Sequence, residues 1–255
     1  MISLKTGRDI ELMRQAGMIT AAARALAGEM VKPGVSTKAI DRAVHDFIVE
    51  HGATPSFLNY NGYPASVCIS INEQVIHGIP GSRRIKEGDI VSIDVGAFYK
   101  GYHGDCAATF IAGYVDSEIR KLVEVTRQSF FEGLKFARAG NRVPDISHAI
   151  QSYVEKNGFS VVRQFVGHGI GQKLHEEPEV PNFVVPGPRV RLVPGMTLAI
   201  EPMVNMGGSS IRILEDGWTV VTEDGKPSAH YENTVLITDG EPMILTPLDG
   251  DGGFE

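Results

Sequence analysis

The spacing of hydrophobic and polar residues predicts four helices. Apolar residues recur every three or four positions, the period of an amphipathic helix, in the segments 8–28, 37–51, 116–138 and 144–157. Thr6 followed by Asp9 resembles a capping box at the start of the first segment, with Asp in the position usual for Glu or Gln. Pro144 suits the first turn of the fourth segment, where no N–H is needed.

Between and after these helices the pattern changes to short runs rich in β-formers. Such runs, bounded by turn residues, predict strands at 66–71, 89–95, 104–112, 161–166, 196–204, 211–214, 218–222 and 231–238. Helices and mostly antiparallel strands that occur in both halves of the chain favour an α+β fold.

The two halves of the chain also resemble each other. A shift of 106 positions places Gly34 on Gly140, and with one more residue inserted "EGDIVSIDV" falls on "PGMTLAIEP". Asp94 then meets Glu201, a carboxylate on a carboxylate at the end of matched strands. We therefore expect one domain over 1–250 with two pseudo-symmetric halves, at about 8–112 and 116–240, and a disordered tail at 251–255.

Composition and charge narrow the class of protein. The 255 residues carry a net charge of −7 and no basic run, which argues against a nucleic-acid groove. Cys68 and Cys106 form no CxxC pair, so we expect no disulfide framework and a reducing compartment such as the cytoplasm. The first residues lack the apolar core of a signal peptide, and no apolar run approaches the ~20 residues of a membrane span.

Two aspartates stand where strands should be apolar. Asp94 lies in "IVSIDV" and Asp105 leads into "CAATFI". If the turn between them is centred on residues 99–100, they lie directly opposite on paired strands, with Cβ atoms roughly 4.5–5.5 Å apart. Ionised carboxylates this close repel each other unless a shared proton or a divalent cation compensates. Exposure of both at a turn or sheet edge is the alternative.

Three further residues favour the cation. His168 lies between glycines in "FVGHGIGQ", which predicts a loop that aims it into a cleft, or a surface histidine. Glu201 ends the apolar run "MTLAIEP", and Glu232 in "AHYENTVLIT" shares a strand face with His230, either in a site or toward solvent. Four carboxylates and an imidazole suit Mn, Fe(II), Co or Mg, and Zn is also compatible. Such a set neutralises about two divalent cations, and two metals ~3.5–4 Å apart activate a bridging water.

These residues and their surroundings resemble the pita-bread metallopeptidases of family M24, and within them the type I methionine aminopeptidases. The resemblance extends over almost the whole chain and rests on "NGYPASVCISINEQVIHGIPG", "GDIVSIDVGAFYKGYHGDCAATF", "VGHGIGQKLHEEP", "GMTLAIEPM" and "AHYENTVLIT". It implies a pita-bread fold, in which helices cover a curved antiparallel sheet.

The resemblance also implies a role for each candidate ligand. Asp94 would bind one metal through both oxygens, Asp105 and Glu232 would bridge two metals, and His168 and Glu201 would complete the other shell. The cofactors would be two divalent ions, Co, Mn, Fe(II), Zn or Ni, with the physiological metal left open. Glu201 would carry protons for the bridging water that attacks the first peptide carbonyl.

Other matched positions imply substrate contacts. His77 resembles the histidine at the scissile amide nitrogen, and His175 the one that hydrogen-bonds the substrate carbonyl oxygen. The methionine side chain would lie among Tyr60, Tyr63, Cys68 and Trp218. The chain departs from some members at Phe57, where they carry cysteine, and at Leu174, where they carry an aromatic residue, and both would reshape the pocket entrance.

The function implied is removal of the initiator methionine from nascent proteins and peptides that have a small second residue. The enzyme would be a cytoplasmic monomer that needs neither nucleic acid nor membrane, and transient association with ribosomes is left open. Alternatives are an Xaa-Pro peptidase of the same fold, a non-catalytic binding protein on the same scaffold, and a metal-free creatinase-like enzyme. The complete set of ligand positions disfavours the last two.

Overall fold

The computed structural model describes residues 2–187 and 189–247. Its helices are α1 (Gly7–Glu29), α2 (Thr37–Glu50), α3 (Ser117–Leu134) and α4 (Val143–Lys156), with a 3₁₀ turn, η1, at Tyr60–Gly62. All four predicted helices are therefore confirmed. The predicted tail at 251–255 lies outside the described residues.

Local sequence signals explain where the helices begin and end. The backbone N–H of Thr6 donates to Asp9 Oδ2 at 3.1 Å, as the capping-box pattern predicted, and Pro144 lies in the first turn of α4. The predicted end of α3 at residue 138 is wrong, because the helix stops at Leu134 and the chain turns to bury Ala137 and to give Gly140 a φ of 94°. A positive φ suits glycine, which has no Cβ.

Antiparallel strands form four small sheets in the described part of the chain. The orders are β1-β4-β2 with β5 paired to β4, β13-β10-β6, β11-β12-β3 and β15-β14-β9-β7-β8. The strands span β1 Thr54–Pro55, β2 Val67–Ile71, β3 Gln74–Ile76, β4 Ile90–Tyr99, β5 Tyr102–Ile111, β6 Ser160–Val161, β7 Gly167–Gly169, β8 Glu176–Val180, β9 Thr197–Ile200, β10 Met203–Asn205, β11 Ile211–Ile213, β12 Val220–Thr222, β13 Ser228–His230, β14 Asn233–Leu236 and β15 Met243–Ile244.

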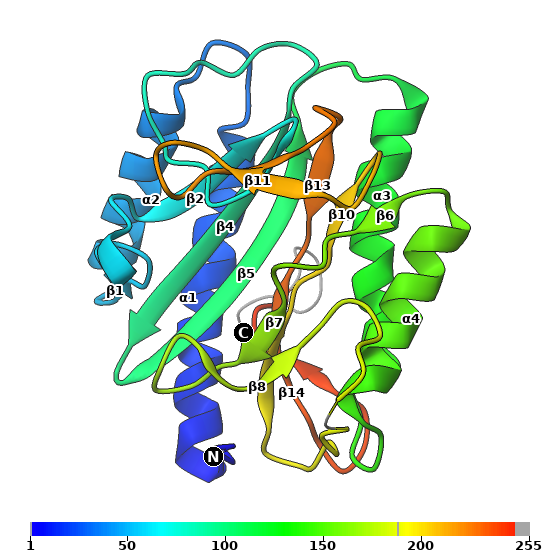
Figure 1. Ribbon diagram of the computed structural model, residues 1–255. Coiled ribbons are helices and arrows are strands. Elements are labelled where there is room, and N and C mark those ends of the chain that lie inside the picture. Colours follow the sequence, from blue (N-terminus) through cyan, green and yellow to red (C-terminus); the bar gives the residue numbers. More distant parts are fainter. Residues whose placement is uncertain (1, 188, 248–255) are drawn as a thin grey trace.

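Two hydrophobic cores hold the helices against these sheets. Figure 1 shows α1 and α2 on one side of the molecule and α3 and α4 on the other, with the long β4–β5 hairpin between them. Val44 and Ile93 belong to the core under α1 and α2, and Phe130, Ile150 and Leu198 to the core under α3 and α4. The predicted α+β class is confirmed, whereas the relation between the two halves stays a prediction. None of the helices in the described part of the chain is long and apolar enough to span a membrane.

The β4–β5 hairpin corrects the predicted register. Tyr99 pairs with Tyr102, so the turn is Lys100–Gly101, and both of these residues have positive φ, as a two-residue type I′ turn requires. The predicted turn centre at residues 99–100 is wrong by one position. Asp94 therefore faces Ala107, and Asp105 faces Gly96. Each aspartate is thus two residues away from its predicted partner, and because side chains alternate between faces, both aspartates still project from the same face.

Several predicted strands are interrupted. The run 196–204 splits into β9 and β10 at Glu201–Pro202, because proline lacks the N–H that a ladder needs. The run 231–238 becomes β14, which starts only at Asn233 and is preceded by β13. The run 161–166 ends almost at once in β6. Strands β1, β3 and β15 are too short for any alternation to predict them.

The glycines around His168 form a strand, β7, rather than the predicted loop. A Cβ on Gly167 would collide with the Ala199 carbonyl oxygen, and one on Gly169 with the Glu177 carbonyl oxygen. The two glycines therefore allow β8 and β9 to approach β7 closely. A bulge between His168 and Gly169 then shifts the register with β8, which re-aims the histidine.

Candidate metal centre

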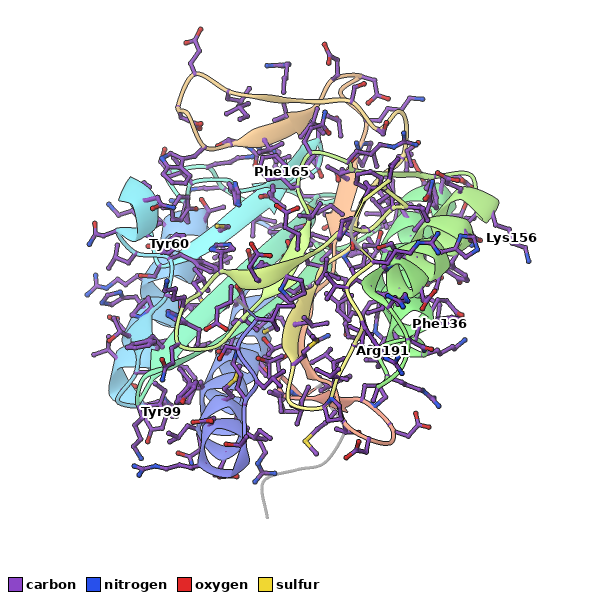
Figure 2. The ribbon with its side chains drawn as sticks, turned by 60° about the horizontal axis from the view of Figure 1, so that its bottom comes forward. Tyr60, Tyr99, Phe136, Lys156, Phe165 and Arg191 are labelled. Carbon is purple, nitrogen blue, oxygen red and sulfur yellow. The ribbon has the colours of Figure 1, made fainter. Side chains whose placement is uncertain are left out.

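One cavity gathers every residue that the sequence singled out for chemistry. Its volume is about 140 Å³. The lining includes Phe57, Tyr60, Tyr63, Cys68, His77, Asp94, Asp105, His168, Leu174, His175, Glu201, Trp218 and Glu232. Phe165, which no motif indicated, also lines it, and Figure 2 labels Phe165 and Tyr60 as members of two separate segments.

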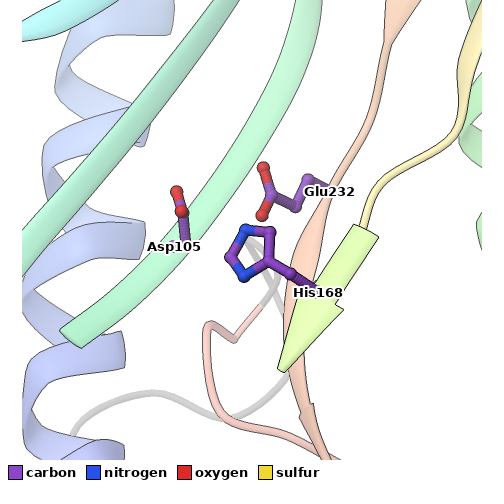
Figure 3. Close-up of side chains that lie close together, drawn as sticks. All are labelled: Asp105, His168 and Glu232. Carbon is purple, nitrogen blue, oxygen red and sulfur yellow. The ribbon is translucent and has the colours of Figure 1, made fainter. Parts of the chain in front are cut away.

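Three donors converge closely at the base of this cavity. Asp105 of β5, His168 of β7 and Glu232, between β13 and β14, each offer one ligand atom, and these atoms lie within 4.8 Å of one another. Figure 3 shows the three side chains pointing toward a common centre. Backbone bonds hold the arrangement, because Ala107 N–H donates to the Glu232 carbonyl at 3.2 Å and Glu232 N–H to the Ala107 carbonyl at 2.9 Å.

The remaining two predicted ligands flank this centre. Glu201 follows β9, and its Oε1 lies 3.5 Å from Nε2 of His168. Asp94 projects from β4 beside Cys68, with which it pairs in the β2–β4 ladder. Oδ1 of Asp94, like Oδ1 of Asp105 and Oε1 of Glu232, is buried with no hydrogen-bond partner in the described protein.

Burial makes this carboxylate cluster costly without a counter-charge. It raises the pKa of Asp94 to about 7. Burial first, and neighbouring carboxylates second, raise the pKa of Asp105, Glu201 and Glu232 well above their usual range. Burial also lowers the pKa of His168 to about 3, which leaves its imidazole neutral and able to ligate a metal.

The donor set fits divalent cations. Orphaned buried oxygens need a compensating charge, and four carboxylates would balance the charge of two dications. Oxygen-rich donors with a single imidazole suit Mn, Fe, Co or Mg, and imidazole also suits Zn and Ni. We conclude that the residues present suit a metal centre.

His230 also faces this centre, although it was not among the predicted site residues. Its Nε2 lies 3.9 Å from Oε2 of Glu201 and 3.9 Å from Oε2 of Glu232. The side chain is 2% exposed, and Nε2 has no hydrogen-bond partner among the described residues. Alternation in "AHYEN" places His230 on the same strand face as Glu232, and this was the sequence feature that could have indicated it. Its pairing with Met203 brings it beside Glu201, and no local pattern gives that contact.

His77 and His175 lie above the ligand cluster. His77 has a φ of 59°, a conformation that non-glycine residues rarely adopt and that concentrates at functional sites. Burial lowers its pKa to about 4. Nδ1 of His175 shares a hydrogen bond with the Tyr60 hydroxyl at 2.8 Å. The ring centroid of His175 lies 4.2 Å from that of His168. Burial lowers the pKa of His175 as well.

Apolar and aromatic side chains form the other end of the cavity. The Tyr63 hydroxyl donates to the carbonyl oxygens of Val67 at 3.0 Å and Gly78 at 2.9 Å, which fixes the ring. Trp218 meets that ring edge-on at a centroid distance of 5.2 Å. Burial raises the pKa of the Cys68 thiol well above its usual value, so it stays protonated.

The two positions that depart from some family members also lie here. Phe57 and Leu174 are buried, and Phe57 packs so close to Gly96 that any Cβ there would clash. Gly96 therefore allows the aromatic ring to form part of the wall. Both residues contribute to the apolar end and neither belongs to the ligand cluster.

A cluster of buried carboxylates at the base of a cavity, with histidines above it and an apolar pocket beside it, defines a metal-dependent hydrolase site. The model of metallopeptidase family M24 matches residues 11–239. This chain belongs to that family.

The most similar relatives narrow the class further. A methionine aminopeptidase of Clostridium perfringens is 57% identical over 246 residues, which are 96% of this chain and 99% of the relative. The crystal structure of a methionine aminopeptidase from Thermotoga maritima has a TM-score of 0.95 and 44% identity, and covers 97% of this chain and 100% of its own. These similarities confirm the predicted resemblance.

A more distant neighbour shares the fold alone. The prolidase from Pyrococcus furiosus has a TM-score of 0.79 and 23% identity, and the match covers 96% of this chain but only 65% of the prolidase. The pita-bread fold that the resemblance implied is therefore confirmed.

Proposed function

We propose that the protein removes N-terminal methionine from proteins and peptides whose second residue is small. The observation that carries the proposal is the cavity of about 140 Å³, with a carboxylate cluster at its base and Tyr63, Cys68 and Trp218 at its apolar end. A thioether packs well against aromatic edges, at ~0.3–1.5 kcal/mol per contact. The methionine aminopeptidases among the relatives support the same assignment.

The five ligand positions would hold two divalent cations. Asp94 would hold one cation, His168 and Glu201 would hold the other, and Asp105 and Glu232 would serve both. When bound, the cations supply an activated water molecule and stabilise charge on the scissile carbonyl. Their identity among Co, Mn, Fe(II), Zn and Ni depends on cellular supply.

Glu201 acts as the proton carrier. Burial and the neighbouring Asp94 carboxylate raise the pKa of Glu201 in the metal-free protein, and a carboxylate that lies at the water-binding position can act as a general base. It receives the proton of the attacking water and returns it to the departing amine. The variant Glu201→Gln keeps the shape of the side chain but cannot accept and return a proton.

The two histidines act as hydrogen-bond partners of the substrate. Their lowered pKa values keep both imidazoles neutral at pH 7, with one N–H each. His175 donates to the carbonyl oxygen of the first residue, and the Tyr60 hydroxyl fixes its ring through Nδ1. His77 contacts the scissile amide nitrogen, held in place by its strained backbone.

The free α-amine explains why only the first residue is removed. The carboxylate shell at the base of the cavity attracts an ammonium or amine group, which an internal peptide bond lacks.

The substrate implies where the enzyme works. N-terminal methionine is exposed on chains as they are synthesised, so we propose a cytoplasmic monomer that associates transiently with ribosomes. A complete donor set within one chain supports a monomeric active unit. Gel filtration and co-sedimentation with ribosomes measure both properties.

Peptide cleavage after chelation tests the assignment. We expect cleavage of Met-Ala-Ser to stop when the metal is removed and to return with added Mn, Co or Fe(II). Glu201→Gln should lower turnover by about 10²-fold or more, even at metal concentrations high enough to saturate the weakened site, while the protein remains folded. Preferential cleavage of Xaa-Pro dipeptides would instead assign an Xaa-Pro peptidase. Metal-independent behaviour without cleavage would assign a binding protein.

A further inference from the structure

A second cavity lies behind the metal centre, between α1 and α3. Its volume is about 220 Å³, and its polar lining comes from Arg24, Thr109, Arg127, His230 and Tyr231. Residues of α1, β5, α3 and β13 supply most of its lining. None of these lining residues belongs to the lining of the substrate cavity.

Arg24 is a buried cation without an acidic partner. Its side chain lies on α1 with the residue only 3% exposed. Nη1 reaches the Glu232 carbonyl oxygen at 3.5 Å and Asn233 Oδ1 at 3.4 Å, both of them neutral acceptors at long distance. None of the ion pairs among residues 2–187 and 189–247 includes Arg24. An unpaired buried charge is unfavourable by several kcal/mol, so this guanidinium favours a counter-ion.

Arg127 brings a second positive charge to the same cavity. It is exposed on α3, and its guanidinium lies 4.9 Å from the Phe131 ring centroid and 6.0 Å from that of Tyr231. These rings restrict the guanidinium to the cavity wall. The buried Tyr231 hydroxyl also lines the cavity, lies near Arg127 and Asn233, and has no close hydrogen-bond partner in the described part of the chain. The cavity therefore offers two cations and a hydroxyl group, and none of the described residues that line it carries a carboxylate.

We propose that this cavity binds an oxyanion of the phosphate class, either free inorganic phosphate or the phosphoryl group of a small metabolite. Guanidinium groups present forked N–H donors that match phosphate oxygens, and the Tyr231 hydroxyl adds a neutral donor. A bound anion would neutralise Arg24 directly behind the backbone of Glu232. This site is separate from the peptide chemistry and does not depend on the proposed function.

Calorimetric titration of the full chain with inorganic phosphate at constant ionic strength tests the proposal. We expect one saturable site per chain, with the same affinity in metal-loaded and chelated protein. Arg127→Met and Arg24→Lys should each weaken binding about tenfold or more, because each loses charge-assisted hydrogen bonds. Arg120→Met, an exposed arginine on the same helix, is the matched control and should stay within about twofold.

Two further measurements keep the result unambiguous. Arg127 is exposed, so its variant should retain the wild-type unfolding midpoint and the basal cleavage of Met-Ala-Ser. Competition with adenosine monophosphate separates the sources: displacement of phosphate assigns a phosphorylated metabolite, and no displacement assigns the free ion. Absence of saturable binding, binding only to metal-loaded protein, or equal binding in Arg127→Met would overturn the proposal.

Discussion

At the scale of single residues, the centre depends on groups whose charge the protein alone does not balance. Oδ1 of both Asp94 and Asp105 is buried without a donor in the described residues. Burying such oxygens is unfavourable unless a cation or proton compensates. His175 and His230 occupy different positions at this centre. His175 lines the substrate cavity, whereas His230 lies beside the candidate ligands Glu201 and Glu232. Their substitution should therefore affect different quantities.

His175→Ala should lower turnover about 10²–10³-fold and leave metal content nearly unchanged, because it removes one hydrogen-bond donor to the developing oxyanion. Steady-state kinetics and metal analysis on the same preparation measure both. His148→Ala, an exposed histidine on α4, is the matched control. Equal loss of turnover and metal would instead place His175 among the ligands.

His230→Leu should weaken metal affinity about 10–100-fold, the usual effect of removing an outer partner of a ligand. Its Nε2 lies 3.9 Å from both Glu201 and Glu232, within reach after a small movement of either side chain. His230→Gln keeps an N–H donor and should lose less affinity. Competition with a chelating dye measures the difference, and identical losses in the two variants would argue against a donor role.

At the scale of elements, periodicity predicted the helices well and the strand ends poorly. Val44 and Ile48 mark one face of α2 and are both fully buried, so burial and sequence pattern agree there. The type I′ turn at Lys100–Gly101, the strand at Gly167–Gly169 and the break at Pro202 each depend on one or two residues. Such features contain too few residues for a hydrophobic period to be detected, and they depend on contacts with neighbouring strands.

The candidate ligands were predictable for a related reason. A carboxylate such as Asp94 inside an apolar run stands out in the sequence because burial alone disfavours it. His230 does not stand out, because its relation to Glu201 arises only from the β10–β13 pairing. A functional residue that interrupts the hydrophobic pattern can be predicted from the sequence. A functional residue that is compatible with the pattern can be recognised only from the three-dimensional structure.

Gly167→Ala should destabilise the protein by about 1–3 kcal/mol, because the new methyl group collides with the Ala199 carbonyl and forces β7 away from β9. Urea unfolding of chelated protein measures the change independently of metal binding. Gly208→Ala, where the added atom meets nothing closer than 4.0 Å, is the control. A difference between the two variants below about 0.5 kcal/mol would show that the sheet relaxes freely.

At the scale of the whole molecule, metal occupancy and pH should together set stability. The histidines give a smaller, opposite effect, because burial keeps His168 and His230 neutral in the folded state, whereas each is about half protonated at pH 6.5 in the unfolded chain. The carboxyl pKa values are raised, to about 7 for Asp94 and well above the usual range for Glu232. The folded state then binds more protons than the unfolded state, so stability falls as pH rises.

Chelated protein should therefore unfold more easily at pH 8 than at pH 6.5, and metal-loaded protein should show a much smaller difference. Thermal unfolding of both forms at the two pH values provides the comparison. A chelated protein whose stability is equal or greater at pH 8 would mean that its carboxyl groups are already ionised at pH 6.5.

The donors of the metal centre are widely separated along the chain, from Asp94 on β4 to Glu232 just before β14. During synthesis, most of the polypeptide must emerge from the ribosome before all the donors can come together. Unfinished chains consequently cannot assemble the complete candidate centre and would not hold divalent cations there. Under the proposed assignment, cation binding would wait until nearly the whole chain has been made, because the donors lie on strands that are far apart in the sequence.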